Sequence, residues 1–362
     1  MTRVTTMERR LGSALFRLAD ERDEPELGRL LDETPMEGSV RLQFTRRPSY
    51  LRAAGIQGAQ VQVIVAHVDG ELAGVGTRAL RDAWIDGERR TVGYLSDLRV
   101  AQRFRGTTHL ARGYRFLREL HEDGRASLYT SVIVADNAPA LSTLASGRRS
   151  LPTYTDMGLV RTPLLRLRKR RRELDSRIRR ATAADWPRIV DKLNENRMQF
   201  APIHVLEDFV AGGRYPGLAA EDFLLAIDGE RVRGVMAVWN QSAFRQTVVH
   251  GYAGAMRVFR PVLNALGLAA LPRPGGVLEY STVAFVSTDD DATFEALLRR
   301  ATNDELRRGR RQLVVGLHER DSRARCLEEY SRTEFAGRLF TVTFGSPPSL
   351  DDRVPFVEAA LL

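Results

Sequence analysis

The pattern of apolar and polar positions predicts a three-strand meander early in the chain. Residues 61–67 and 72–79 alternate between the two classes, which indicates half-buried strands, and Asp69-Gly70 between them is typical of a tight hairpin turn. A second such pair, Asp86-Gly87, leads into a third strand around residues 94–100. These three segments should form consecutive antiparallel strands.

Helices and further strands are predicted on both sides of this meander. Apolar residues at three- and four-residue spacing, opened by two threonines that can cap a helix, predict a helix directly after the third strand; they are Leu110, Tyr114, Leu117 and Leu120. Ala14–Leu18 reads as a preceding strand, followed by a helix near Asp23 with Pro25 in its first turn. Residues 128–134 form another strand. It ends at Asp136-Asn137, which opens a helix, and residues 154 and 159–167 supply the last strand or strands.

The pattern then starts again in the second half of the chain. Residues 17–25 align with residues 179–187, with identities at Arg17, Ala19, Asp23 and Pro25. Asp69-Gly70-Glu71 has its counterpart in Asp228-Gly229-Glu230. A recurrence of this kind is typical of a duplicated domain with loop insertions. We therefore expect two similar halves, residues 1–168 and 177–362, joined by a basic linker at 169–176.

Length and composition agree with two globular domains. The chain has 362 residues, of which 43% are hydrophobic and 28% are charged. We find no apolar run long enough to cross a bilayer and no secretory signal. With Cys326 as its single cysteine, the chain cannot form an intramolecular disulfide, so a cytoplasmic location is expected.

The net charge of +9 is carried almost wholly by arginine, because Lys169 and Lys192 are the only lysines. Such a surface could attract nucleic acid, anionic lipid or a polyanionic cofactor. Compositional drift towards arginine explains it equally well. The charge alone therefore selects no partner, and it leaves nucleic acid as an unfavoured but open one.

The segment between the third strand and its helix carries the chemistry. A strand that enters a helix through a short glycine-containing loop directs free N–H groups and the positive end of the helix dipole at one point, which suits a pyrophosphate. Arg103-Phe104-Arg105-Gly106-Thr107-Thr108 resembles the acyl-CoA loop of the GNAT acyltransferase superfamily, Q/R-x-x-G-x-G/A. Arg103 and Gly106 fit the pattern, whereas Thr108 stands where glycine or alanine is usual.

The resemblance implies a fold and a cofactor. The fold would be α/β (α+β), with two tandem GNAT-like domains, each a mixed, mostly antiparallel central sheet flanked by helices. The cofactor would be acetyl-CoA or another acyl-CoA. Its pyrophosphate would be held by Arg103 and by the backbone of Arg105, Gly106, Thr107 and Thr108. Its pantetheine arm would pair with Leu98 and Val100 on a splayed strand, and Asn137 is a further contact whose other role is that of an N-cap.

The same resemblance implies acyl transfer to a small-molecule or peptide amine by direct attack in a ternary complex. Asp97 is the candidate base, although neighbouring residues of a strand face opposite sides, so Asp97 and Leu98 share a wall only if a bulge intervenes. Tyr154 is the candidate acid beside the sulfur, and a core aromatic is its other interpretation. No metal site is expected, since the six histidines lack ligand spacing.

The second half should have lost cofactor binding. There the corresponding strand runs into Asp289-Asp290-Asp291, without glycine or arginine, and these carboxylates would repel a pyrophosphate. They are suited instead to cap the following helix. This half would shape the acceptor cleft or form a contact in a homodimer.

Two other functions stay open at this point. Tandem GNAT-like halves and a basic surface also suit a transferase that takes its acyl group from aminoacyl-tRNA, although tRNA needs no pyrophosphate loop. A non-catalytic acyl-CoA-binding module is the other alternative. The acceptor cannot be named from the sequence.

Overall fold

The computed structural model describes residues 7–35, 40–106, 108–145, 147–148, 150–265 and 271–362. Its larger sheet has nine strands. In spatial order they are β1 (Glu8–Leu11), β2 (Ala14–Leu18), β4 (Gln60–Val68), β5 (Glu71–Ile85), β6 (Glu88–Val100), β7 (Tyr129–Val134), β18 (Ala336–Thr343), β8 (Thr153–Arg161) and β16 (Leu317–His318). All pairings within it are antiparallel except that of β6 with β7.

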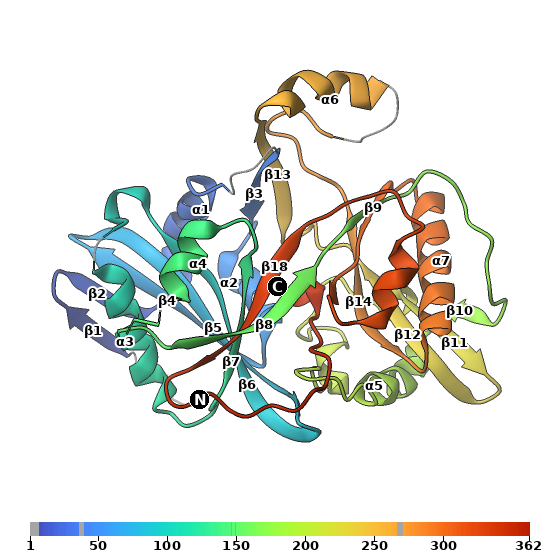
Figure 1. Cartoon of the computed structure of the whole chain (residues 1–362), viewed down its shortest axis with the longest axis horizontal. Helices are drawn as coiled ribbons and strands as arrows, with labels where there is room; N and C mark the ends of the chain where they lie inside the picture. Colours follow the sequence, from blue (N-terminus) through green and yellow to red (C-terminus); the bar gives the residue numbers. More distant parts are fainter. Residues whose placement is uncertain (1–6, 36–39, 107, 146, 149, 266–270) are drawn as a thin grey trace.

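A second sheet has seven strands, and a two-stranded ribbon projects beside the two sheets (Figure 1). In order, the second sheet contains β10 (Ile178–Arg180), β11 (Phe223–Asp228), β12 (Arg231–Trp239), β14 (Ser281–Thr288), β15 (Gln312–Val314), β9 (Leu164–Arg166) and β17 (Arg332–Thr333). The ribbon pairs β13 (Gln246–Tyr252) with β3 (Val40–Thr45) and so joins distant parts of the chain. The predicted mixed α/β fold with mostly antiparallel sheets is confirmed.

The predicted meander is β4, β5 and β6. Asp69 and Asp86 both have positive φ, 51° and 52°, and each is followed by a glycine of positive φ. Two successive residues in this region make the turn whose twist matches a hairpin. The Asp-Gly pairs therefore fix the register of the three strands.

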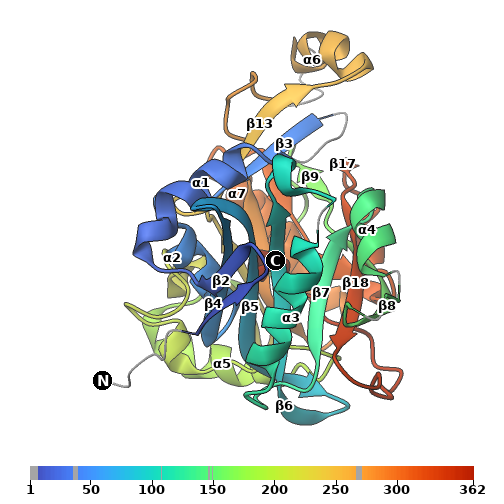
Figure 2. The same cartoon turned by 90° about the vertical axis from the view of Figure 1, so that its left-hand side faces the viewer.

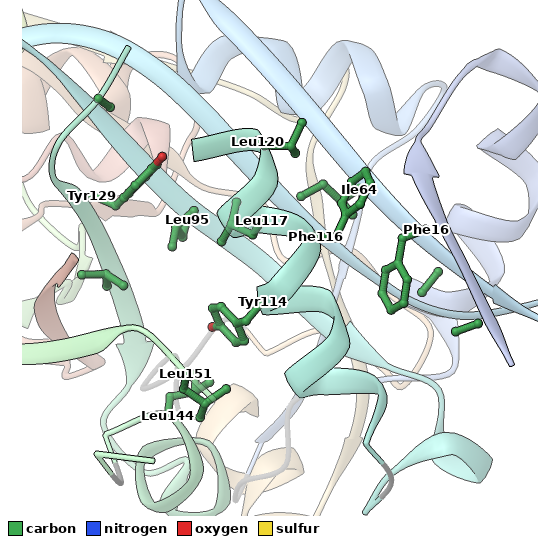
Figure 3. Packing of buried hydrophobic residues seen from close by; sticks show 14 of the residues in the cluster. Phe16, Ile64, Leu95, Tyr114, Phe116, Leu117, Leu120, Tyr129, Leu144 and Leu151 are labelled. Carbon is green, nitrogen blue, oxygen red and sulfur yellow. The ribbon is translucent and has the colours of Figure 1, made fainter. Parts of the chain in front are cut away.

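Helices cover both faces of the nine-stranded sheet. Val63 and Val65 of β4 pack with α1 (Glu24–Asp32) and α2 (Tyr50–Ala54). Ile64 and Ala66 lie on the opposite face, with α3 (His109–His121) and α4 (Ala138–Leu144), because side chains alternate along a strand. Figure 3 shows this second core around α3, and Figure 2 shows α3 in front of the sheet.

The remaining helices belong to the later part of the chain. The second sheet carries α5 (Trp186–Asn194) and α7 (Asp291–Arg307), while α6 (Ala255–Ala265) stands at the end of the ribbon (Figure 1). Among the described helices, none combines the length and the apolar composition that crossing a bilayer requires.

The two sheets exchange strands. β18, from the end of the chain, lies between β7 and β8 of the first sheet, while β9 leaves the first half and pairs with β15 of the second. Each sheet is thus completed by a strand from the other half of the sequence. Separating the halves would expose the hydrogen-bonding edges of β7 and β15.

The aligned segments 17–25 and 179–187 form the same corner in both halves. Arg17 donates two hydrogen bonds to Asp23, at 2.7 and 2.6 Å, and Arg179 donates two to Asp185, at 2.8 and 2.7 Å. Each aspartate directly precedes a helix that carries a proline in its first turn. The shared geometry supports a repeated unit, and its origin by duplication stays a prediction.

Candidate active site

The first sheet opens between β6 and β7. These parallel strands pair at Gly93 and Tyr94, and the Ser131 hydroxyl still reaches the Leu95 carbonyl at 2.9 Å. Beyond this point no pairing joins them in the part of the chain that the structure describes, and β6 continues to Val100 while paired with β5 alone. The edge of β6 that faces β7 is therefore free to pair with an extended ligand.

A bulge lies on β6 directly beside this opening. Thr77 pairs with Ser96 and Val75 with Arg99, so Gly76 stands opposite two residues, Asp97 and Leu98. Asp97 has a φ of +53°, which turns the strand locally. Because of this bulge both Asp97 and Leu98 line one cavity, which a regular strand would not allow.

That cavity has a volume of about 1070 Å³ and reaches from the opening into the space between the two sheets. Its walls come from β5, β6, β7, α3 and α4 of the first half, from both strands of the ribbon, and from β14 and the final residue Leu362. Much of the wall is apolar and includes Ile64, Leu95 and Leu117. Figure 3 shows these three side chains in the core around α3.

The loop before α3 turns some of its predicted groups away from the opening. Arg103 forms an ion pair with Glu71 and lies over the Phe104 ring, and the Nε of Arg105 donates to the Val100 carbonyl at 3.2 Å. Gly106 has a φ of +75°, with open space where a side chain would be. The loop therefore presents its backbone rather than its arginine side chains.

The first residues of α3 line the cavity, whereas the described residues of the preceding loop do not. Thr108 is the N-cap of α3 but makes no side-chain capping bond, and Thr107 lies outside the described residues. His109 and Leu110 of the first turn line the cavity, whereas Arg103, Arg105, Gly106 and Thr108 do not. The N-terminus of α3 thus stands at the mouth of the cavity.

The two remaining sequence candidates also line the cavity. The side chain of Asn137 accepts a hydrogen bond from the Ala140 N–H at 3.2 Å and so caps α4. The Tyr154 hydroxyl lies 2.6 Å from that of Tyr114 on α3, and burial raises the pKa of Tyr154 to about 12. At neutral pH this phenol keeps its proton, so it can donate one but is not a base.

Charged groups gather on the face of the sheet covered by α1 and α2. Asp97 forms an ion pair with Arg46, whose guanidinium lies 4.7 Å from the centre of the Tyr50 ring. Arg99 and Arg245 also line the cavity near Asp97, and burial, with the nearby Arg46, lowers the pKa of Arg245 to about 10.

The second sheet repeats the opening, but the chain itself fills it. β14 and β15 pair in parallel at Ser281 and Thr282 and then part, and Phe285 lies in a bulge with a φ of +51°. The Glu358 carboxylate accepts the Phe285 N–H at 2.7 Å, and Val357 beside it lines a remaining space of only about 10 Å³. Burial raises the pKa of Glu358 to about 7.

The acidic corner of the second half has the predicted structural role. Asp290 is the N-cap of α7, accepting the Thr293 N–H at 2.7 Å, and it also accepts a hydrogen bond from Arg233. Asp289 forms ion pairs with Lys192 and Arg231. The carboxylates are therefore already matched by helix and side-chain donors.

Solved structures with a similar fold include enzymes of acyl transfer. N-myristoyltransferase of Saccharomyces cerevisiae with bound myristoyl-CoA superposes with a TM-score of 0.64 at 8% identity, covering 97% of this chain and 89% of that one. A glucosamine N-acetyltransferase region of a fungal multi-domain GH3 β-N-acetylglucosaminidase gives 0.63 at 14% identity, over 92% of this chain and 38% of that one. The chain has the GNAT fold.

A third structure, a GCN5-related N-acetyltransferase from Sphaerobacter thermophilus, matches this GNAT fold over 96% of the chain and 98% of its own, with a TM-score of 0.53 and 13% identity. No protein-family model matches the sequence, and no curated protein matches it. Because the likenesses are far below 25% identity, they establish the architecture and leave the reaction to be argued from the site.

Several cavity residues were not singled out from the sequence as site residues. Arg245 lies on the connection before β13, Tyr114 on α3 and Leu362 at the end of the chain. The spacing of apolar residues along α3 indicated that Tyr114 is buried. No local sequence pattern indicated Arg245 or Leu362, because only long-range packing brings them to the opening in the first sheet.

Proposed function

We propose that this protein is an acyl-CoA-dependent N-acyltransferase that transfers the acyl group, in the simplest case acetyl, directly to an amine. One observation supports this most: β6 and β7 part beside the N-terminus of α3, at a bulge that opens into a large cavity. A free strand edge suits the amides of pantetheine, and a helix N-terminus suits a pyrophosphate. The structural neighbours named for acyl transfer add weight to this reading.

In the first step the protein would bind the acyl-CoA donor. The backbone around Gly106 and the first turn of α3 would bind the pyrophosphate, with Asn137 at the facing N-terminus of α4. The free edge of β6, from Leu98 to Val100, would pair with the pantetheine arm. An N–H group at the bulge would then stabilise the negative charge that develops on the thioester carbonyl oxygen.

The second step transfers the acyl group. The neutral amine attacks the thioester carbon, a C–N bond forms, and the C–S bond breaks as the thiolate leaves. Asp97, at the bulge, would accept a proton from the amine directly or through water. Tyr154, which keeps its proton at neutral pH, would donate one to the departing sulfur. Holding the amine and the thioester close together in the cavity would supply much of the rate.

Binding and turnover test the proposal together. Acetyl-CoA should raise the melting temperature, whereas tRNA should not, and a panel of amines should release free CoA thiol. Stabilisation by tRNA alone would favour the aminoacyl-tRNA-dependent alternative. Binding of acetyl-CoA without turnover on any amine would favour the non-catalytic module.

A matched pair of glycine variants makes the binding test specific. Gly106 and Gly124 both have positive φ, 75° and 69°, and both have open space at the position of a Cβ. Gly106→Ala and Gly124→Ala should therefore cost similar backbone strain, of about 1 kcal/mol. Affinity for acetyl-CoA should fall in the first variant only, since Gly124 follows the far end of α3.

The remaining sequence expectations stay proposals. These are the division at residues 1–168 and 177–362 with a basic linker at 169–176, a cytoplasmic location, a second half that shapes the acceptor cleft or forms a homodimer contact, and nucleic acid as an unfavoured but open partner. The exchanged strands support joint folding of the two halves. Gel filtration with light scattering would measure the oligomeric state.

A further inference from the structure

Three guanidinium groups line the cavity near the carboxylate of Asp97. Arg46 forms an ion pair with it, and Arg99 and Arg245 lie close enough to interact with its charge. The other acidic residues in the cavity wall, Asp136 and Glu334, are exposed at its rim, and Glu334 forms an ion pair with Arg332. The cluster around Asp97 therefore carries an excess of positive charge.

Arg46 has a buried donor that nothing in the described part of the chain accepts. Its side chain is only 8% exposed. Its guanidinium forms an ion pair with Asp97 and lies over the ring of Tyr50. Its Nη1 is buried and has no hydrogen-bond partner among the described residues. A guanidinium presents five N–H donors, and leaving one of them buried without an acceptor costs free energy.

Arg245 and Arg99 have free donors as well. Nη1 of Arg245 donates to the backbone oxygens of Ala360 and Leu362, at 3.3 and 2.8 Å, while its Nε and Nη2 find no partner in the described part of the chain. Arg99 donates through Nη1 to Thr34, and its buried Nε is likewise unmatched there.

Two arginines buried elsewhere in the chain, Arg78 and Arg323, have their donors paired with a carboxylate. Arg78, whose side chain is 0% exposed, donates to both oxygens of Asp123 and to Gln62. Arg323 is held in the same way by Asp321. A buried cation is ordinarily paired in this manner because its desolvation is otherwise too costly. The cluster around Asp97, the base in the proposed function, departs from that pattern.

We infer that the acceptor is an amine that also carries an anionic group, a carboxylate or a phosphate, which Arg46, Arg99 and Arg245 bind. This inference rests on the proposed function and specifies its acceptor. Guanidinium groups bind both anions through paired N–H donors. The anion would fix the molecule so that its amine lies at the bulge, beside Asp97.

The phosphates of CoA are a poor explanation for the cluster. Tyr50, against which Arg46 lies, packs with α1 on one face of the sheet, whereas the N-terminus of α3 belongs to the opposite face. A donor that enters beside α3 therefore leaves its phosphates on the far side of the sheet. The cluster stays available for the second substrate.

Paired probes separate the charge from the rest of the acceptor. L-Phenylalanine and L-phenylalaninamide differ in a carboxylate, and glucosamine 6-phosphate and glucosamine differ in a phosphate. We expect kcat/KM with acetyl-CoA to be about 10- to 100-fold higher for the anionic member of at least one pair, which is the range for hydrogen bonds to a charged group. The pair that responds identifies the anion.

Variants then assign the effect to the cluster. Arg245→Gln and Arg46→Gln should reduce the preference for the anionic member about tenfold or more, even if Arg46→Gln also lowers kcat on both members through Asp97. Arg47→Gln is the matched control, because this neighbouring side chain is 70% exposed and pairs with Asp32. It should leave the preference unchanged.

Calorimetric binding of the same probes to the enzyme saturated with CoA makes the test independent of turnover. Turnover with equal kcat/KM for charged and neutral members overturns the inference and leaves the proposed function standing. So does a preference that survives Arg245→Gln and Arg46→Gln. If no amine reacts, the proposed function fails, and the inference then stands or falls on whether the anionic probes bind more tightly than their neutral partners.

Discussion

Replacing Glu358 by glutamine should change how the stability of this protein depends on pH. Glu358 is 4% exposed, and its carboxyl accepts the N–H of Phe285 within the second sheet. Burial raises its pKa from an ordinary 4.5 to about 7, with the two backbone hydrogen bonds acting in the opposite direction. The folded state therefore retains a proton that the unfolded state releases.

The sign and size follow from proton linkage. Between about pH 4.5 and pH 7 the folded protein binds more protons than the unfolded chain at this site, so stability falls as the pH rises. A displacement from 4.5 to about 7 corresponds to roughly 3 kcal/mol in total, and about 2.5 kcal/mol of it should be lost between pH 5 and pH 8. Glutamine has nearly the same shape and no charge, so Glu358→Gln should abolish this part.

Urea unfolding of both proteins at pH 5 and pH 8 measures the effect. The difference in unfolding free energy between Glu358→Gln and the parent protein should shift by about 2 kcal/mol or more in favour of the variant at the higher pH. Because other titrating groups are common to both proteins, they cancel in this difference. Glu88→Gln, at an exposed site, should show no shift. A constant difference for Glu358→Gln would refute the reasoning.

Three further outcomes are expected. Tyr154→Phe should lower kcat about 100-fold with little change in the KM for acyl-CoA, and an unchanged kcat would leave Tyr154 as a core aromatic packed on Phe340. Gly93→Ala should destabilise the fold by about 2 kcal/mol or more in chemical unfolding, because its Cβ would lie 2.0 Å from the Tyr129 ring; an unchanged midpoint would contradict this. Asp23→Asn should lower the free energy of unfolding by about 3 kcal/mol, because its partner Arg17 is only 18% exposed. Asp185→Asn should lower it by about 1 to 2 kcal/mol, because Arg179 is 43% exposed and better screened by water. A larger loss for Asp185→Asn than for Asp23→Asn would count against the argument.

Local patterns along the chain were sufficient for most of the first half. The alternation in β4 and β5, the Asp-Gly turns and the apolar stripe of α3 each express contacts between residues close in sequence. The bulge at Asp97 could be anticipated only through the family resemblance. Without this bulge, Asp97 and Leu98 would point to opposite faces of the sheet, because side chains alternate along a regular strand. The bulge is what lets both residues line the same cavity.

Neighbouring residues were enough to set the strands and turns of the meander, the helix after Gly106 and the N-cap of α7 at Asp290. Tertiary structure alone decided the exchange of β9 and β18, the filling of the second opening by the segment around Glu358, and the meeting of Arg46, Arg99 and Arg245 around Asp97. The physical reason is sequence distance. Strand pairing and charge pairing between residues that lie about 50 to 200 positions apart depend on how the whole chain packs, and no local period records them.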